Sequence, residues 1–552
     1  MGTVPRPFYI GLNMSGSVSA GAYTAGVIDF LVEAMDVWCA ERERQTQQFG
    51  ADYARWGIPA HEVQLAAMAG ASGGGITAAL TAAALAQNFA HVRDQSPHPD
   101  APANTLFQSW VRDIDLSALL GHADLDANGG KLVSLLDSTP IRAIASHALR
   151  ITDPLPSRRA WVRDGLKVIL TLTNVAGVPY AIEPQTDADS ARALYHADRR
   201  QFEVLWNSPP SGGETIALAA AGGAGWDDLA EAAIATSAFP VVLAPQILNR
   251  TAAEYNRRRW RIPVANPKCG PDGACECEVS DLMPPTWKLE DGDRIETLNV
   301  DGGATNNSPF DCTRLELAGL PPAVPGGHNP RDPKQADRAV ISIAPLYTDV
   351  SPDAPRLPDV DLGSLLFGFV NAVVNQSRLQ GENLRLSADP GVASRWVIAP
   401  TPEISGVEPL AGSLLCAFGA FLSHRFREHD YQLGRRNCQR FLTTYFVLPR
   451  ENRLLGEYGA AAAGDFVPVI PVLGELRNEI RVDRNPISQN DLIALADLAL
   501  DRIKRVAHAM VASSGFVSAL AFNAGWLFLK SRIREKLLVY AGRELASHGF
   551  VE

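Results

Sequence analysis

The chain has 552 residues, 46% of them hydrophobic, so it can bury a large core, and its length favours two structural units over one. The formal net charge is −11 and there is no long basic run, which argues against nucleic acid as a partner. Seven cysteines, an odd number, argue against a disulfide framework, and no apolar signal core lies near Met1. We therefore expect a cytoplasmic protein.

The first predicted strand, Phe8–Asn13, leads into a loop of small residues, Met14–Gly21, and a helix is predicted over Ala22–Glu43. A small-residue loop between a strand and a helix can present free backbone N–H groups to an anion. The anion could be a bound phosphate or the oxyanion of a reacting ester. The loop matches neither G-x-x-x-x-G-K-[ST] nor G-x-G-x-x-G, so a nucleotide site is the weaker of these two interpretations.

The stretch around Ser72 has the pattern of a nucleophile elbow. A short apolar run, Val63–Ala69, predicts a buried strand, and the alanine-rich run Ile76–Phe89 predicts a helix. Between them lies a G-x-S-x-G pentapeptide that begins at Gly70 and ends at Gly74. This context places a serine hydroxyl on a sharp turn at the edge of a sheet, where glycines leave room for the turn. An ordinary glycine-rich turn with an incidental serine is the alternative.

The middle of the chain contains a predicted central strand, Lys167–Asn174, and later a segment that we interpret as an insertion, Arg250–Asp293. The insertion is charged, contains prolines and lacks periodicity. It contains Cys269, Cys275 and Cys277, whose C-x5-C-x-C spacing fits no common zinc site and has no evident fourth ligand. A loop with free thiols is therefore favoured over a metal centre.

Asp301 follows a short predicted strand, Glu296–Val300, and is itself followed by Gly302 and Gly303. Side chains at the carboxyl ends of strands in an open α/β sheet line the active crevice. A carboxylate in that position, close to Ser72, could accept the proton of the serine hydroxyl. The alternative is an aspartate that closes a turn, because Asp-Gly-Gly is also ordinary turn chemistry.

Strands become scarce in the C-terminal part, where a long helix is predicted over Leu362–Leu386. A later helical stretch, Val506–Leu529, carries no Asp, Glu, Lys or Arg and exceeds the roughly 18 residues that suggest a membrane helix. Several Ser, His and Asn residues lower the hydrophobicity of this stretch. We rank three alternatives for this stretch. A helix packed on the core is favoured, an interfacial helix on anionic lipid is second, and a true membrane span is third.

The loop Met14–Gly21, the pentapeptide ending at Gly74 and the Asp301-Gly-Gly motif, in this order, resemble the patatin-like phospholipase family. The similarity extends over residues 8 to 346 approximately. Further segments that resemble the family are Leu135–Arg142, Ala232–Pro240, Asn306–Pro309 and, as in bacterial members, His429–Arg440.

The resemblance implies an α/β fold, a three-layer α/β/α sandwich with a mostly parallel central sheet. We assign this catalytic domain to residues 1–350, with the insertion at about 250–293. A mainly helical C-terminal region, residues 351–552, would follow. The resemblance implies no cofactor and no metal.

The resemblance also implies the chemistry: hydrolysis of carboxylic ester bonds in lipids or phospholipids through an acyl-enzyme. By their places in the motifs, Ser72 matches the nucleophile and Asp301 the general base. The backbone N–H groups of Gly16, Ser17 and Val18 would form the oxyanion hole. Residues 506–529 are the candidate for peripheral contact with a membrane.

One position departs from the family pattern, because Ala20 stands where the first loop usually carries an arginine. Three readings of the site remain open: the Ser72–Asp301 dyad, an α/β-hydrolase triad completed by His424 or His429, and a lipid- or partner-binding protein that has lost catalysis.

Overall fold

The computed structural model describes residues 6–93, 103–129, 131–182, 191–269, 275–324, 329–346, 391–401, 408–458, 464–512 and 516–552, and single positions between 347 and 390. Its centre is a nine-stranded mixed sheet in the order β11-β10-β1-β2-β3-β4-β5, with β9 paired to β3 and β6. The strands are β1 (Pro7–Met14), β2 (Glu62–Gly70), β3 (Val162–Ile182), β4 (Ala191–Leu205), β5 (Thr215–Ala219), β6 (Gln246–Thr251), β9 (Arg294–Asp301), β10 (Arg338–Ile343) and β11 (Arg395–Ile398).

The five strands from β11 to β3 run parallel, whereas β4 and β9 are antiparallel to β3. The fold is therefore mixed α/β with a mostly parallel central sheet, as predicted. Parallel strands are covered on both faces, which explains the continuous apolar runs of β1 and β2. The parallel strands all end at one edge, where Met14 and Gly70 lie side by side in neighbouring strands.

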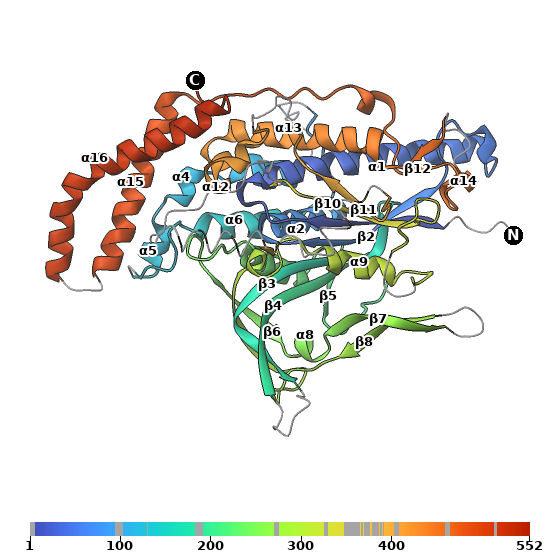
Figure 1. Ribbon diagram of the computed structural model, residues 1–552, viewed down its shortest axis with the longest axis horizontal. Helices are drawn as coiled ribbons and strands as arrows, with labels where there is room; N and C mark the ends of the chain where they lie inside the picture. Colours follow the sequence, from blue (N-terminus) through green and yellow to red (C-terminus); the bar gives the residue numbers. More distant parts are fainter. Residues whose placement is uncertain are drawn as a thin grey trace.

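Helices cover both faces of the sheet (Figure 1). One face carries α2 and α7, with α1 packed against α2, and α9 packs on the other face against β1, β2 and β10. The principal helices are α1 (Gly21–Phe49), α2 (Ser72–Ala86), α6 (Thr139–Ala148), α7 (Gly225–Thr236), α9 (Phe310–Ala318), α13 (His424–Arg440), α15 (Gln489–Ala512) and α16 (Phe516–Ser547). Shorter helices are α3 (Thr105–Phe107), α4 (Leu116–Leu119), α5 (Ala123–Ala127), α8 (Ala253–Asn256), α12 (Leu414–Ala417) and α14 (Leu455–Tyr458).

The C-terminal helix α13 lies along α1, as Figure 1 shows. Arg435 of α13, almost fully buried, forms ion pairs with Asp29 and Glu33 of α1, which are also buried. The main hydrophobic core contains side chains from both ends of the chain, from Phe8 to Leu476. The C-terminal region is helical, as predicted, and it completes the core around the N-terminal sheet.

Helix α1 with its preceding turn, Val18–Phe49, is the one described helix long and apolar enough to cross a membrane by length and composition. It lies inside the protein, because 94% of its most apolar window is buried. Packing against α2, α3 and α13 accounts for its apolar character.

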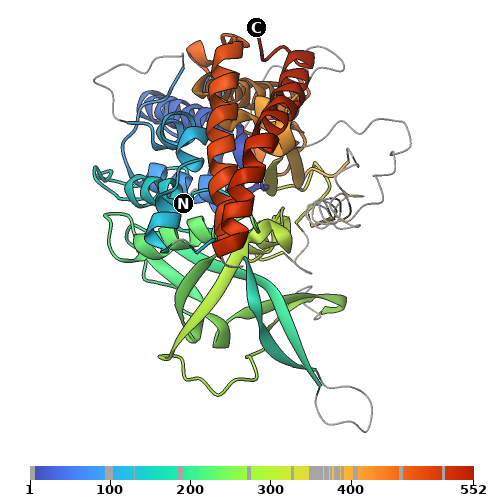
Figure 2. The same cartoon turned by 90° about the vertical axis from the view of Figure 1, so that its left-hand side faces the viewer.

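Two helices, α15 and α16, pack against each other at the C-terminus and form a hairpin at one side of the molecule (Figures 1 and 2). The predicted stretch Val506–Leu529 is therefore not one continuous helix, since α15 ends at Ala512 and α16 begins at Phe516. In the sequence, Ser513, Ser514 and Gly515 lie between the ends of these two helices, and these are residue types with low helix propensity. The long helix predicted over Leu362–Leu386 lies almost entirely outside the described residues.

The segment Arg250–Asp293, in which we favoured a loop around the cysteines, contains a β-hairpin, so the expectation of a loop was wrong. Strand β7 (Arg259–Cys269) pairs antiparallel with β8 (Cys275–Leu282). In β8, Cys275, Cys277 and Val279 alternate with glutamates, and this period-two alternation indicates a strand. The side chains of these three residues lie outside the description.

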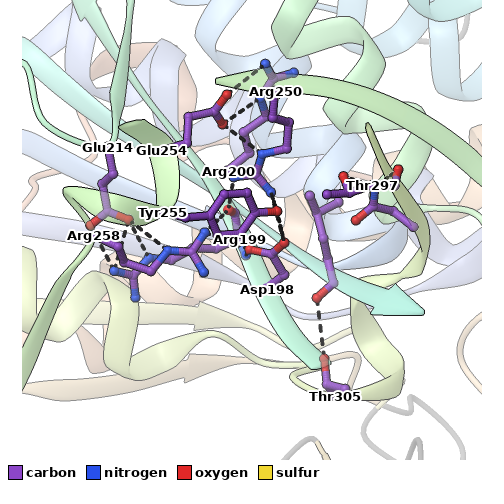
Figure 3. Close-up of polar contacts among 12 residues, drawn as sticks. Asp198, Arg199, Arg200, Glu214, Arg250, Glu254, Tyr255, Arg258, Thr297 and Thr305 are labelled. Atoms are coloured by element: carbon purple, nitrogen blue, oxygen red, sulfur yellow. Dashed lines mark hydrogen bonds and ion pairs between the residues drawn. The ribbon is translucent and has the colours of Figure 1, made fainter. Parts of the chain in front are cut away.

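A buried network of charges joins β4, β6 and α8 (Figure 3). The Asp198 side chain is fully buried, and its carboxylate accepts hydrogen bonds from Arg250 at 2.9 Å, Arg258 at 2.7 Å and the Tyr255 hydroxyl at 2.8 Å. Although burial opposes ionisation, the charges of Arg250 and Arg258 hold the pKa of Asp198 down at about 2. The network fixes β6, and β6 pairs with β9, the strand that ends at Asp301.

Candidate active site

Ser72 occupies the sharp turn between β2 and α2. Its φ of +53° lies in the left-handed region, which is strained for any residue other than glycine. A Cβ on Gly70 would lie 2.5 Å from the carbonyl oxygen of Gly74, and one on Gly74 would lie 2.2 Å from that of Met14. The predicted strand–turn–helix arrangement is thus present, and both glycines are needed for its close backbone approach.

The Ser72 hydroxyl donates a hydrogen bond to the Asp301 carboxylate, with 2.6 Å between Oγ and Oδ2. The other carboxylate oxygen accepts the backbone N–H of Gly303 at 2.6 Å, and the Asp301 N–H is bound by the Ala238 carbonyl. Asp301 is 2% exposed. Burial raises its pKa to about 7, against the opposing effect of the hydrogen bonds from Ser72 and Gly303.

The loop before α1 packs directly on the first turn of α2. Gly16 faces Ser72, since a Cβ on Gly16 would lie 3.3 Å from the Ser72 Cβ. The N–H of Gly16 donates to the Asn307 carbonyl at 2.9 Å and so is not free to bind an oxyanion. The N–H groups of Ser17 and Val18 have no hydrogen-bond partner within the described residues. Val18 has a φ of +46°, a rare conformation for a β-branched residue, so this loop is strained as well.

The histidines considered for a triad lie elsewhere. His424 is exposed at the start of α13, and His429 is buried with its Nδ1 3.0 Å from Asp430 Oδ1. In the parts of the chain that the structure describes, no histidine forms a hydrogen bond with Ser72 or Asp301. The geometry is that of a serine–carboxylate pair, with no imidazole between the two.

Comparison with known proteins gives one relationship that covers nearly the whole chain. The "Uncharacterized protein y4iI" of Sinorhizobium fredii (strain NBRC 101917 / NGR234) is 32% identical over 592 aligned positions, which cover 96% of this chain and 79% of that protein.

The chain belongs to the family of y4iI.

No family model matches the sequence. The alignment with y4iI spans both the sheet and the C-terminal helices. The other contacts of the site, described next, include residues from both of these regions.

A C-terminal segment holds the loop in place. The Ser19 hydroxyl donates to the Ala417 carbonyl at 2.7 Å, and a Cβ on Gly412 would lie 2.8 Å from Ala20. Asp430 of α13, fully buried, in turn accepts the N–H of Gly412 at 2.8 Å. Ala20 is fully buried against Gly412, so there is no room for the arginine that the patatin-like pattern would place there, and these contacts hold the loop against the C-terminal segment.

Thr236, at the end of α7, is a site residue to which the sequence reasoning gave no role. Its hydroxyl accepts the backbone N–H of Ser72 at 3.0 Å, and the residue is fully buried. It therefore helps to hold the strained turn. The sequence feature that could have indicated this role is that Thr236 lies in Ala232–Pro240, a segment that resembles the patatin-like family.

An apolar cavity of about 30 Å³ lies beside α2. Ile76, one turn after Ser72, lines it together with Trp110, Ile141 and Ile234. Trp110 also reaches the turn itself, since its ring lies 3.3 Å from where a Cβ on Gly73 would be. The cavity has room for one or two water-sized groups and an apolar wall, which suits hydrocarbon better than water.

Within the described residues, no group of His, Cys, Asp or Glu is arranged to hold a metal ion.

Proposed function

We propose that the protein is a serine acyl hydrolase of the patatin-like type, which cleaves carboxylic ester bonds of lipids through a Ser72–Asp301 dyad. The observation that carries the proposal is the 2.6 Å hydrogen bond between a serine on a strained strand-to-helix turn and a buried carboxylate. A serine is a weak nucleophile until a neighbouring base accepts its proton. The apolar cavity beside α2 supports an acyl chain as the group bound next to Ser72.

In the proposed mechanism Asp301 accepts the hydroxyl proton while Ser72 Oγ attacks the ester carbonyl carbon. The oxyanion that forms is stabilised by the free N–H groups of Ser17 and Val18 and by the positive end of α2, which begins at Ser72. Collapse of the tetrahedral intermediate breaks the ester bond, and the proton held by Asp301 passes to the leaving alcohol. Water, deprotonated by Asp301, then attacks the acyl carbon, the bond to Ser72 Oγ breaks to release the fatty acid, and the proton held by Asp301 returns to Ser72 Oγ.

We expect kcat/KM for ester hydrolysis to rise with pH through an apparent pKa near 7. The base must be ionised to accept the proton, and burial raises the pKa of Asp301 to about 7. Activity should therefore be largely lost at pH 5 and reach a plateau above pH 8. Initial rates with a soluble ester, whose leaving group is followed at a pH-independent wavelength, check this. A plateau that extends down to pH 5 would contradict Asp301 as the base.

We expect Ile141→Ala to favour longer acyl chains. The substitution enlarges the apolar cavity beside α2 and removes about three carbons from its wall. The ratio of kcat/KM for p-nitrophenyl octanoate to that for the butyrate should rise several-fold. Ile58→Ala, a buried isoleucine outside the cavity, is the matched control and should leave the ratio unchanged. An unchanged ratio in Ile141→Ala would separate this cavity from the acyl site.

The function itself is tested by assaying the purified protein on a panel of p-nitrophenyl esters, phospholipids and neutral glycerolipids beside Ser72→Ala. We expect hydrolysis of at least one lipid ester that depends on Ser72. Equal rates for the two proteins on every substrate would refute the proposal.

A further inference from the structure

A cavity of about 390 Å³ lies between α13 and the segment 475–483, which runs along that helix (Figure 1). Its volume is within the range of sites for small molecules. Gln439 of α13 ties the segment to the helix, because its amide nitrogen donates to the carbonyls of Leu476 and Asn478, each at 2.6 Å. One face of α13 forms a wall of the cavity, with Glu428, Gln432, Arg435 and Gln439 at intervals of three or four residues.

Glu428 contributes a carboxylate that has no partner. The residue is 8% exposed, and its Oε1 atom is buried without a hydrogen bond. No ion pair joins this carboxylate to any residue that the structure describes. Burial raises the pKa of Glu428, and the charge of Arg112 offsets that effect only in part. A buried carboxylate without a counter-charge is costly, so this group is available to bind a cation.

Gln432, one helical turn after Glu428, provides a second unused acceptor. Its amide nitrogen donates to the Val92 carbonyl at 3.3 Å, while its Oε1 atom is buried with no donor among the described residues. Gln432 is 5% exposed. Buried polar atoms without a partner are rare in folded proteins, and each requires an explanation. A ligand that brings N–H donors into the cavity would satisfy both neighbouring acceptors.

The cations deep in the cavity are already neutralised. Arg435 pairs with Asp29 and Glu33 of α1, and Arg93 pairs with Glu33 and with Glu475. These ion pairs leave neither guanidinium as a free counter-charge for Glu428.

The opening of the cavity carries further unpaired charges. Glu479 and Asp483 are exposed, line the cavity and form no ion pair with a described residue, and the same holds for Arg481. Together with Glu428, three unpaired carboxylates therefore face one unpaired guanidinium. This balance favours a ligand with two positive charges.

Apolar side chains complete the lining, which includes Phe30, Leu476 and Ile480. Phe30 and Leu476 are buried, and Ile480 is half-buried. A hydrated divalent metal ion needs several oxygen ligands and gains nothing from apolar walls. An organic cation with a methylene chain uses both the acidic and the apolar groups.

We propose that this cavity binds an aliphatic diamine, a molecule in which a short methylene chain joins two ammonium groups. One ammonium group donates to the Glu428 carboxylate and the Gln432 amide oxygen. Glu479 and Asp483 hold the second at the opening. The proposal concerns binding and does not depend on the ester hydrolysis proposed above.

The test is calorimetric titration of the full chain with putrescine, together with thermal unfolding in its presence. We expect a dissociation constant below about 1 mM and a rise in the unfolding temperature. Butylamine, which has one ammonium group, should bind at least about tenfold more weakly. Glu428→Gln should weaken putrescine binding by about tenfold or more, and Glu479→Gln with Asp483→Asn by several-fold.

Two controls separate binding from folding. Without ligand, Glu428→Gln should unfold at no lower temperature than the parent, because it removes an unpaired buried charge. Glu231→Gln is the matched variant outside the cavity: Glu231 is exposed on α7, and the variant should bind putrescine like the parent.

Three results would overturn the proposal. The first is absence of putrescine binding up to about 10 mM, or equal binding by the parent and Glu428→Gln. The second is Ca²⁺ binding that is tighter than putrescine binding and is lost in Glu428→Gln, because the cavity would then be a metal site. The third is a lower unfolding temperature of ligand-free Glu428→Gln, which would give the carboxylate a structural role. None of these measurements involves an ester substrate.

Discussion

Ser72→Ala and Asp301→Asn should each reduce kcat for ester hydrolysis by about 10⁴-fold or more, because the two side chains act as one unit. Ser72→Ala removes the nucleophile, and Asp301→Asn removes the base while keeping the shape of the side chain. The double variant should be little worse than either single one, since neither group works without the other. Steady-state rates on a soluble ester, with active-site titration of the parent, give these values.

A loss of activity in Asp301→Asn must not come from unfolding, and the ionisation of Asp301 predicts the stability of this variant. Its pKa in the folded protein, about 7, lies above its ordinary value of 3.8, so ionisation is unfavourable to the folded state. The stability that its protonated form contributes is fully present below pH 4 and is lost as the pH rises through 7. Asp301→Asn should therefore unfold at no lower temperature than the parent at pH 8. Ser134→Ala, another buried serine, should retain activity. An active Asp301→Asn protein would contradict the dyad.

Asp198→Asn should destabilise the protein by about 3 to 5 kcal/mol, the largest effect on folding that we expect from a single substitution. It leaves Arg250 and Arg258, both nearly fully buried, without their shared counter-charge. The network is drawn in Figure 3. The free energy of unfolding, measured by urea denaturation at pH 7, checks the prediction.

The pH dependence of the same network has a definite sign. The pKa of Asp198 falls from 3.8 to about 2 on folding, so its contribution is present above pH 4 and is lost as the pH falls toward 2. That loss amounts to about 2 kcal/mol. Asp497→Asn is the matched control, because Asp497 pairs with Arg534 on the exposed hairpin, and we expect it to have little effect on unfolding. Equal stability of Asp198→Asn and the parent would show that the buried charges are dispensable.

The parts of the site that the sequence predicts are those encoded by short contiguous patterns. The strand before Ser72, the small-residue turn and the helix after it are local, and Asp301 follows its own strand in the same way. Residues 72 and 301 meet because β2 and the antiparallel strand β9 both pair with β3 and run toward each other, so that Gly70 lies opposite Leu170 and Asp301 lies opposite Leu172. The helix predicted over Ala22–Glu43 was also correct, as part of α1.

The contacts that the sequence did not predict depend on packing between distant segments. The Gly16 N–H is occupied by the Asn307 carbonyl, so one of the three predicted oxyanion donors is engaged elsewhere. Gly412 and Asp430 support the loop from the far end of the chain. Hydrophobic periodicity along the sequence cannot predict these contacts, because each contact depends on how two distant segments pack against each other. Within Val506–Leu529, α15 ends at Ala512 and α16 begins at Phe516, and the Ser-Ser-Gly sequence between these two positions favours two helices over one.

The central claim is that Ser72 is an activated nucleophile, and labelling with a fluorophosphonate probe tests it most directly. The phosphorus atom should attach to Ser72 Oγ, with displacement of fluoride, and the adduct should be found by mass spectrometry on the peptide that contains Ser72. Labelling should disappear in Ser72→Ala and fall strongly in Asp301→Asn, while His424→Ala and His429→Ala label like the parent. Labelling that persists in Ser72→Ala, or that is lost when either histidine is replaced, would contradict the account.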